Sequence, residues 1–275
     1  MSSGSILAGT CLPQNQMRGC GLTTMGEMSQ QRRDWDEIGR LDALWAILSD
    51  PMKRHGRWDV DEFMATGQRE IDAMLATAER WNLPERRDHA LDFGCGVGRL
   101  TRALAIHFAG VTGVDISDVM VSRAKAIHAD MPNCVFEVLL EGGLSAMPDR
   151  SFNCIYSRIV LQHIPDRRVT EAHIREFVRL LADGGLLVFQ LPSLIPLRRR
   201  VQVRPTLYAT LRFLRVPEGL LYRRLGLHPI RMRCIPEGDV LRLLTEAGAS
   251  VLMIERSVLG DTGIEDRTYW VTRPR

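Results

Sequence analysis

Long apolar runs are missing from this sequence of 275 residues. No uninterrupted apolar stretch approaches the roughly 18 residues that a membrane-spanning helix needs. The beginning of the chain also has no basic segment followed by a long apolar core, so a secretory signal is not expected. Hydrophobic residues make up 45% and charged residues 25% of the chain, which is typical of globular proteins. We therefore expect a cytoplasmic protein.

Paired cysteines are also missing. The six cysteines are widely scattered, form no C-x-x-C pair, and have no nearby histidine at the spacing of a zinc site. They are Cys11, Cys20, Cys95, Cys134, Cys154 and Cys234. This distribution indicates free thiols in a reducing compartment and predicts no metal site.

The glycine-rich motif of the chain lacks the third glycine of the dinucleotide fingerprint. A short apolar run ends in Asp92 and passes into Gly94, Gly96 and Gly98, after which an amphipathic helix begins. This pattern predicts a strand, a tight turn that approaches a ligand closely, and a helix start whose free N–H groups favour polar or anionic atoms. The fingerprint G-x-G-x-x-G would require a glycine where Arg99 stands. Arg99, and the Asp92 carboxylate that would repel a pyrophosphate, argue against NAD and FAD.

A second acid favours a cofactor of positive charge. Residues 111–115 predict a second strand that ends in Asp115, 23 residues after Asp92. An acid at this spacing and at the end of a strand suits hydrogen bonds from two ribose hydroxyls. A cofactor with a cationic amine and a sulfonium would also be attracted by Asp92. The alternative is an ordinary glycine turn followed by a helix-capping aspartate.

These motifs resemble those of the class I S-adenosylmethionine-dependent methyltransferases, and more narrowly a bacterial group with small-molecule or uncertain substrates. The matching segments, in order, are LDFGCGVGRLT at 91–101, TGVDIS at 112–117, DRSFNCIYS at 149–157, IVLQHIP at 159–165 and LLADGGLLV at 180–188. The resemblance implies an α/β, Rossmann-like fold with a seven-stranded, mostly parallel sheet and helices on both faces. It also implies S-adenosyl-L-methionine as the cofactor and S-adenosyl-L-homocysteine as the product.

The resemblance further implies which residues contact the cofactor. The glycine-loop backbone is expected under the methionine part, an acid and its neighbour at the ribose and adenine, and two residues after strand four at the amino-acid end. In that order they are Gly94, Cys95, Gly96 and Gly98, then Asp115 and Ile116, then Ser157 and Arg158. Asp92 is also expected at the cofactor, where its carboxylate would attract the cationic groups. At the adenine edge many relatives place Asp or Asn where this chain has Leu144, so the backbone amide of Leu144, or Glu141, is expected to substitute.

Alternating strand and helix signals predict a parallel sheet with right-handed crossovers. Strands are expected near 89–93, 111–115, 134–138, 153–157, 185–191, 250–257 and 267–273, the last two as a reversed hairpin. Helices are expected near 34–50, 61–81, 99–108, 117–129, 166–182 and 236–248. The expected organisation is a disordered leader (1–33), an N-terminal helical cover (34–84) and a methyltransferase domain (85–275) with a helical lid insertion at about 193–234.

The lid segment is strongly basic, with ten arginines against the single acid Glu218. The arginines are Arg198, Arg199, Arg200, Arg204, Arg212, Arg215, Arg223, Arg224, Arg231 and Arg233. Such charge favours an acidic substrate, and also suits contact with nucleic acid or anionic lipid. The alternative is a solvated basic face whose side-chain stems cover apolar surface.

His163 is the candidate general base, because it lies six residues past the end of the fourth predicted strand and therefore faces the transferable methyl group. Its ordinary pKa of about 6.5 suits a base. The alternative is a loop histidine that shapes the pocket or caps a helix, and His55 and His228 are weaker candidates. The chain lacks the Asp/Asn-Pro-Pro-aromatic motif of DNA amine methyltransferases, an acidic pair of the arginine-methyltransferase type, and an Asp/Asn cluster for magnesium.

The sequence thus favours metal-independent transfer to a small molecule, at a hydroxyl oxygen, by a monomer or homodimer. Two other hypotheses stay open. One is a methyltransferase of RNA or of a carrier-bound substrate, and the other is an S-adenosylmethionine-binding protein without transfer activity.

Overall fold

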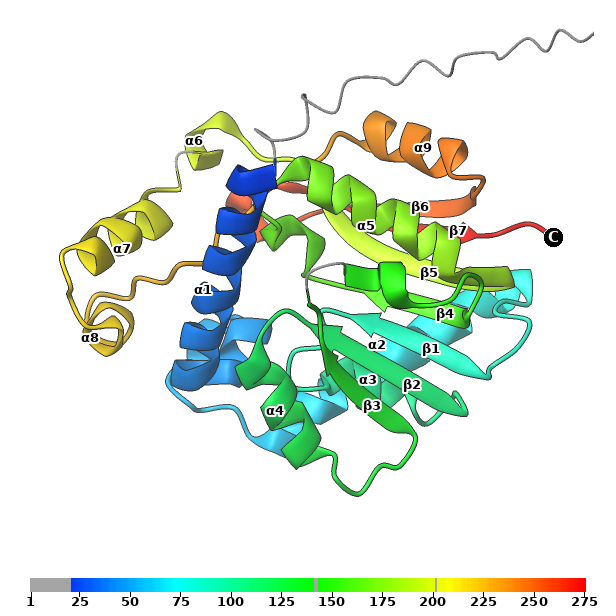
Figure 1. Cartoon of the computed structure of the whole chain (residues 1–275), viewed down its shortest axis with the longest axis horizontal. Coiled ribbons are helices and arrows are strands. Elements are labelled where there is room, and N and C mark those ends of the chain that lie inside the picture. Colours follow the sequence, from blue (N-terminus) through cyan, green and yellow to red (C-terminus); the bar gives the residue numbers. More distant parts are fainter. Residues whose placement is uncertain (1–20, 141–142, 201) are drawn as a thin grey trace, which may run out of the picture.

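Apolar segments separated by polar turns form one seven-stranded sheet (Figure 1). A computed structural model describes residues 21–140, 143–200 and 202–275. The strands are β1 His89–Phe93, β2 Gly110–Asp115, β3 Cys134–Val138, β4 Phe152–Ser157, β5 Leu181–Leu194, β6 Ser250–Val258 and β7 Glu265–Thr272. Their order is β3-β2-β1-β4-β5-β7-β6. Strand β7 runs in the direction opposite to the other six strands. The predicted seven-stranded, mostly parallel sheet with a terminal hairpin is confirmed, although β5 is longer than expected.

Helices surround this sheet and also extend beyond one end of it (Figure 1). They are α1 Gly21–Ile47, α2 Val60–Ala78, α3 Arg99–Leu104, α4 Asp118–Ile127, α5 Arg167–Leu180, α6 Leu197–Arg200, α7 Val203–Phe213, α8 Glu218–Arg223 and α9 Glu237–Glu246. In the part of the chain that the structure describes, no helix combines the length and apolar character needed to cross a bilayer.

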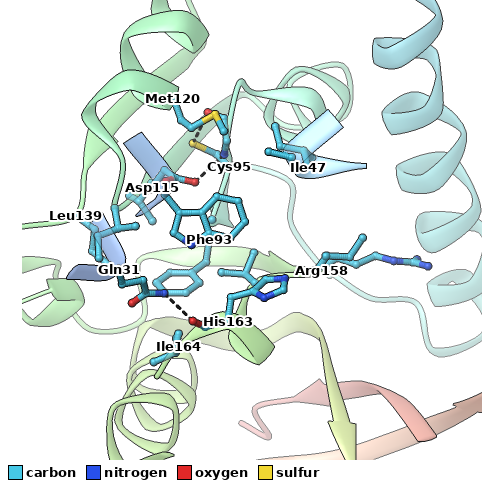
Figure 2. A pocket seen from close by; sticks show the side chains of 18 of the residues that line it. Gln31, Ile47, Phe93, Cys95, Asp115, Met120, Leu139, Arg158, His163 and Ile164 are labelled. Carbon is cyan, nitrogen blue, oxygen red and sulfur yellow. Dashed lines mark hydrogen bonds between the residues drawn. The ribbon is translucent and has the colours of Figure 1, made fainter. Parts of the chain in front are cut away.

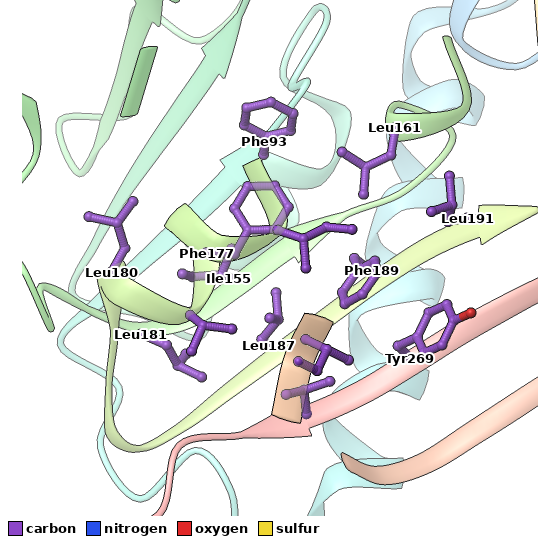
Figure 3. Close-up of a cluster of buried hydrophobic side chains, with 14 of the residues drawn as sticks. Phe93, Ile155, Leu161, Phe177, Leu180, Leu181, Leu187, Phe189, Leu191 and Tyr269 are labelled. Atoms are coloured by element: carbon purple, nitrogen blue, oxygen red, sulfur yellow. The ribbon is translucent and has the colours of Figure 1, made fainter. Parts of the chain in front are cut away.

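The pleat of the central strands sends alternate side chains to two hydrophobic layers. Leu91 and Phe93 of β1 pack on the side of α5 and α9, whereas Ala90 faces α2 and α3. In β5, Phe189 packs in the same layer as Leu91 and Phe93, and Val188 packs in the same layer as Ala90. Figure 3 shows the first layer, in which aromatic and aliphatic side chains from the sheet meet those of α5. Because both faces are covered, the carboxyl ends of the parallel strands are left as the place for a site.

Helix α1 lies across these strand ends (Figure 1) and corrects the predicted leader. Residues 21–33 were expected to be disordered, but they form the first part of α1, while residues 1–20 lie outside the described residues. Asp42 interrupts the helical backbone of α1 (φ −164°, ψ 75°). Its carboxylate accepts hydrogen bonds from the His55 N–H (2.6 Å) and from the Tyr222 hydroxyl (2.8 Å).

The segment between β5 and α9, here called the insertion (residues 195–236), carries α6, α7 and α8. It is attached to α1 by polar contacts. The hydroxyl of Tyr208 donates to Glu37, and Arg212 lies 3.3 Å from the same carboxylate. Tyr222 of α8 adds its bond to Asp42. The insertion and α1 therefore form a common wall beyond the strand ends.

Candidate functional site

The loop between β1 and α3 places bare backbone against a pocket. Gly94 and Gly96 have φ values of +79° and +53°, a conformation that favours glycine. A Cβ at Gly94 would overlap the side chain of Val160, and one at Gly96 would overlap Ile47. Gly98 (φ +85°) serves a different purpose, because it is the N-cap of α3 and does not line the pocket.

Asp115, at the end of β2, fixes this loop and faces the same pocket. Its Oδ2 accepts a hydrogen bond from the Gly96 N–H (2.9 Å), and its Oδ1 accepts one from the Ser117 N–H (2.9 Å). Burial raises the pKa of the Asp115 carboxyl, while these two amides act in the opposite direction. The Ile116 N–H also hydrogen-bonds to this carboxylate, and the lone pair that remains is available to a ligand.

Asp92 does not line the pocket, contrary to the prediction of a cofactor contact. Its side chain lies beneath the loop, and the residue is 1% exposed. Its Oδ2 accepts a hydrogen bond from the Thr101 hydroxyl (2.6 Å). Burial raises the pKa of Asp92 to about 7. This carboxyl therefore does not line the pocket, and below about pH 7 it is mostly protonated.

Asp92→Asn is expected to stabilise the fold increasingly as the pH rises from about 4 to about 7. In that range the folded protein keeps a proton on Asp92 that the unfolded chain has lost, so wild-type stability falls with rising pH. Asparagine removes this dependence, and the difference in the free energy of unfolding should reach the order of 2–4 kcal/mol above about pH 7. Urea unfolding at a series of pH values measures it. Asp88→Asn, at the surface, is the matched control, and a pH-independent difference for Asp92→Asn would contradict the prediction.

The glycine loop forms one side of a pocket with about 890 Å³ of empty space, here called the glycine-loop pocket (Figure 2). Of the predicted contacts, Gly94, Cys95, Gly96, Asp115, Ile116, Arg158 and His163 line it. Residues that the sequence interpretation missed also line it, among them Gln31, Trp35 and Ile47 of α1, Met120 of α4, and Leu139 after β3. Figure 2 places Asp115 and Leu139 on one side and Arg158 on the other, with Phe93 between them.

Two further predicted contacts lie away from this pocket. Leu144 is 1% exposed in the core beside α5, because its apolar side chain packs among Phe93, Phe177 and their neighbours. Leu139 stands at the pocket instead, and Glu141, the other candidate, lies outside the described residues. Ser157 is also buried, and its hydroxyl donates to the Phe93 carbonyl (3.1 Å).

Arg158 joins the pocket to α2. Its Nε lies 3.6 Å from the carboxylate of Glu70, which also accepts hydrogen bonds from the Tyr156 hydroxyl (2.9 Å) and from Arg99 (2.9 Å). Arg99 and Arg158 both line the pocket, so two cations share one buried acid. This end of the pocket is suited to an additional negative charge, such as a carboxylate.

The turn after β4 carries His163 and is held in a strained conformation. Ile159 has φ +60°, which is unusual for a β-branched residue. Its N–H donates to Gln190 Oε1 (2.7 Å), and the Gln190 amide donates to Gln162 (3.0 Å) and to Asp266 (2.7 Å). This buried network fixes the path of the chain immediately before His163.

The contacts of His163 define its tautomer. Nδ1 lies 2.6 Å from the main-chain carbonyl of Arg231, an acceptor only, so Nδ1 carries the proton. Nε2 is then the basic nitrogen, 3.3 Å from the side-chain amide of Gln162. The Trp35 ring stands edge-on to the imidazole at 5.5 Å. Burial lowers the pKa of His163 to about 4, so the ring is neutral at physiological pH.

A second and larger cavity, about 2270 Å³, opens beside the first and is here called the arginine cleft. Ala46, Ile47, Ile159 and His163 line both cavities. His228 lines only the cleft, and His55 lines neither, so His163 alone of the three candidate histidines stands where the cavities meet.

Comparison with known proteins relates part of this chain to methyltransferases. Residues 91–189 match the family described as Methyltransferase domain. The chain is 33% identical over 169 residues to 27-O-demethylrifamycin SV methyltransferase of Amycolatopsis mediterranei, covering 58% of this chain and 60% of that protein. It is 31% identical over 161 residues to a ubiquinone biosynthesis O-methyltransferase of Coxiella burnetii, covering 58% of this chain and 66% of that protein. The match thus spans less than two thirds of either relative.

A solved structure extends the likeness of the fold. Magnesium protoporphyrin IX methyltransferase from Synechocystis PCC 6803, crystallised with bound SAH, superposes with a TM-score of 0.57 at 20% identity. The superposition covers 90% of this chain and 99% of that chain. At this identity the comparison establishes the fold alone.

Proposed function

We propose, for a chain that carries a class I methyltransferase domain, that the protein transfers the methyl group of S-adenosylmethionine to a hydroxyl oxygen of a small molecule. The observation that carries this proposal is the position of His163. Its basic Nε2 belongs to a ring that lines both the glycine-loop pocket and the cleft beside it. A base is useful to methyl transfer at that junction, where donor and acceptor would meet.

The residues of the glycine-loop pocket fit S-adenosylmethionine. Asp115 offers its remaining lone pair to a ribose hydroxyl. Ile116, Met120 and Leu139 supply apolar surface for the adenine. The glycine at position 94 lets the loop backbone reach the pocket while the Val160 side chain packs where a Cβ would stand.

The remaining part of the cofactor suits the opposite end of the pocket. Arg158 supplies a cation for the amino-acid carboxylate. Asp92 lies buried under the loop, where burial favours its protonated form and the positive charge of a bound cofactor would favour its ionised form. Arg99 stands where the dinucleotide fingerprint needs its third glycine, so the proposed cofactor is not NAD or FAD.

When bound, S-adenosylmethionine supplies an activated methyl group on a positively charged sulfur. The chain's contribution is to hold the two reactants in line and to remove a proton. Placement of the acceptor oxygen about 3–3.5 Å from the methyl carbon accounts for much of the acceleration. As the new O–C bond forms and the C–S bond breaks, His163 Nε2 takes the hydroxyl proton in exchange for the hydrogen bond that it accepts from the Gln162 amide. The Arg231 carbonyl stabilises the resulting imidazolium through Nδ1–H.

Transfer to oxygen is also supported by the relatives, because the Coxiella burnetii protein is named as an O-methyltransferase. The described residues contain no group of three or more His, Cys, Asp or Glu side chains placed to hold a metal ion. The proposed reaction relies on the histidine for its proton transfer.

Titration calorimetry with S-adenosylhomocysteine, S-adenosylmethionine and NAD tests the cofactor. We expect Kd values of about 1–100 μM for the first two and no binding of NAD. Release of labelled methyl groups to a panel of hydroxylated small molecules then tests transfer. Binding of NAD in place of S-adenosylhomocysteine would overturn the proposal. Tight binding of the cofactor without transfer of labelled methyl groups to any acceptor, by the wild type and by His163→Gln alike, would favour a non-catalytic binding protein.

A further inference from the structure

Nearly all of the charged residues that line the arginine cleft are cationic. Its lining includes Arg198 and Arg199 of α6, Arg204 of α7, and Arg231, against the single acid Asp50. The Asp50 carboxylate is already used, because it caps a short helix by accepting from the Met52 N–H (2.8 Å).

Across residues 21–140, 143–200 and 202–275, none of the four guanidinium groups takes part in an ion pair or a side-chain hydrogen bond. Arg231 acts on one acid at longer range, since its charge favours the ionised form of Asp34. Arginines that serve the architecture of the same region behave differently. Arg212 pairs with Glu37 (3.3 Å) and Glu218 (3.0 Å), and Arg54 lies between the rings of Trp45 (4.7 Å) and Tyr222 (4.4 Å).

The wall that carries these arginines is fixed by hydrogen bonds. The Gln202 side chain donates to the Met232 carbonyl (2.8 Å) and accepts from the Met232 N–H (2.9 Å). These two hydrogen bonds join the start of α7 to the segment that carries Arg231. Arg204 and Arg231 are therefore held on one wall of the cleft. His228, on the same cleft, has a buried Nδ1 with no hydrogen-bond partner among the described residues.

Apolar side chains complete the cleft between this wall and His163. Trp58, Leu48 and Ile230 line it along with Ile47 and Ile159. Its lining therefore combines an apolar surface with a group of cations, and His163 lies on the same cleft. A ligand that fits has an apolar body and a negatively charged end.

We infer that the arginine cleft holds the acidic end of the methyl acceptor, a carboxylate or a phosphate, while the acceptor's hydroxyl lies against His163. This inference rests on the proposed function, because it assigns an acceptor class to the same site. Arginine binds both anions through paired N–H groups, so the cleft selects for charge and for a planar or tetrahedral oxyanion. The remaining exposed arginines of the insertion, including Arg215, Arg223 and Arg224, lie outside the cleft lining.

The test compares two triple variants that remove the same charge from the same insertion. The cleft variant is Arg198→Gln/Arg199→Gln/Arg204→Gln, and the control is Arg215→Gln/Arg223→Gln/Arg224→Gln. Calorimetry at low salt measures the binding of citrate, of inorganic pyrophosphate and of uncharged triethyl citrate to each protein, with and without saturating S-adenosylhomocysteine. We expect the wild type and the control to bind at least one anion with a Kd of about 1 mM or lower, and the cleft variant to bind at least tenfold more weakly.

The two anions distinguish the acidic group of the acceptor. Tighter binding of citrate indicates a carboxylate, and tighter binding of pyrophosphate indicates a phosphate. Equal binding by the cleft variant and the wild type would overturn the inference, and so would the absence of anion binding in the wild type. Equal losses in both variants would show general surface attraction. A short RNA that binds tightly and loses affinity in both variants would point to nucleic acid instead. The cofactor result is independent, since S-adenosylhomocysteine binding fails only if the proposed function fails.

Discussion

Asp115→Asn is expected to weaken the binding of S-adenosylhomocysteine by more than about 100-fold. The carboxylate holds the Gly96 N–H and also faces the pocket with a free lone pair, so the change removes a ribose acceptor and releases the loop. Hydrogen bonds to a charged group contribute about 1.5–3 kcal/mol each, and two of them account for this loss. Titration calorimetry gives the Kd directly.

Asp118→Asn is the control for this experiment, because it makes the same chemical change three residues further along the chain at the exposed start of α4. Thermal unfolding of both variants shows whether the fold is kept. An Asp115→Asn protein that is folded and binds S-adenosylhomocysteine within threefold of the wild type would exclude the assigned contact.

His163→Gln is expected to lower kcat by about 10²–10⁴-fold while the affinity for S-adenosylhomocysteine stays within a few-fold. Glutamine can still donate to the Arg231 carbonyl, but it has no basic nitrogen. The comparison therefore separates proton removal from the shape of the pocket. Steady-state transfer to the best acceptor of the panel provides the measurement.

The pH dependence of kcat is a second test of His163 as the base. Because burial lowers the pKa of His163 to about 4, wild-type kcat should not fall as the pH decreases from 8 to about 5.5. A histidine with its ordinary pKa would lose half its basic form near pH 6.5. His55→Gln is the control, since His55 lines neither cavity. An unchanged kcat in His163→Gln would mean that the acceptor oxygen needs no base.

The parallel core was predictable because its signals are local. The apolar run of β1, the glycines after it and the acid that ends β2 are each contained in a few residues, and their order fixes the topology. Gly94, Gly96 and Asp115 reach the pocket for the same reason, since they lie at strand ends and in the tight turn. Their positions follow from backbone geometry more than from packing.

The rest of the site depends on contacts between distant segments. The side chain of Gln31 donates to the main-chain carbonyl of His163 (3.0 Å), a contact across 132 positions that no local pattern reports. The predicted leader concealed this part of α1, because its polar sequence carries little helical periodicity. The backbone amide of Leu144 was expected at the adenine edge, but Leu144 does not line the pocket, because its apolar side chain draws the residue into the core. The sequence also did not predict which arginines line the cleft. It shows how many arginines the segment contains, but the packing of the insertion decides where each side chain points.

Under the proposed function, the bond between His163 and the Arg231 carbonyl would link the choice of acceptor to proton transfer. The segment that carries this carbonyl is also a wall of the arginine cleft, and Gln202 fixes its position. A shift of that wall to admit a different acceptor would rotate the imidazole or exchange its tautomer. New specificity in this scaffold therefore has to evolve through side chains that leave the backbone at residue 231 in place, and loop exchange between relatives would change the rate together with the substrate.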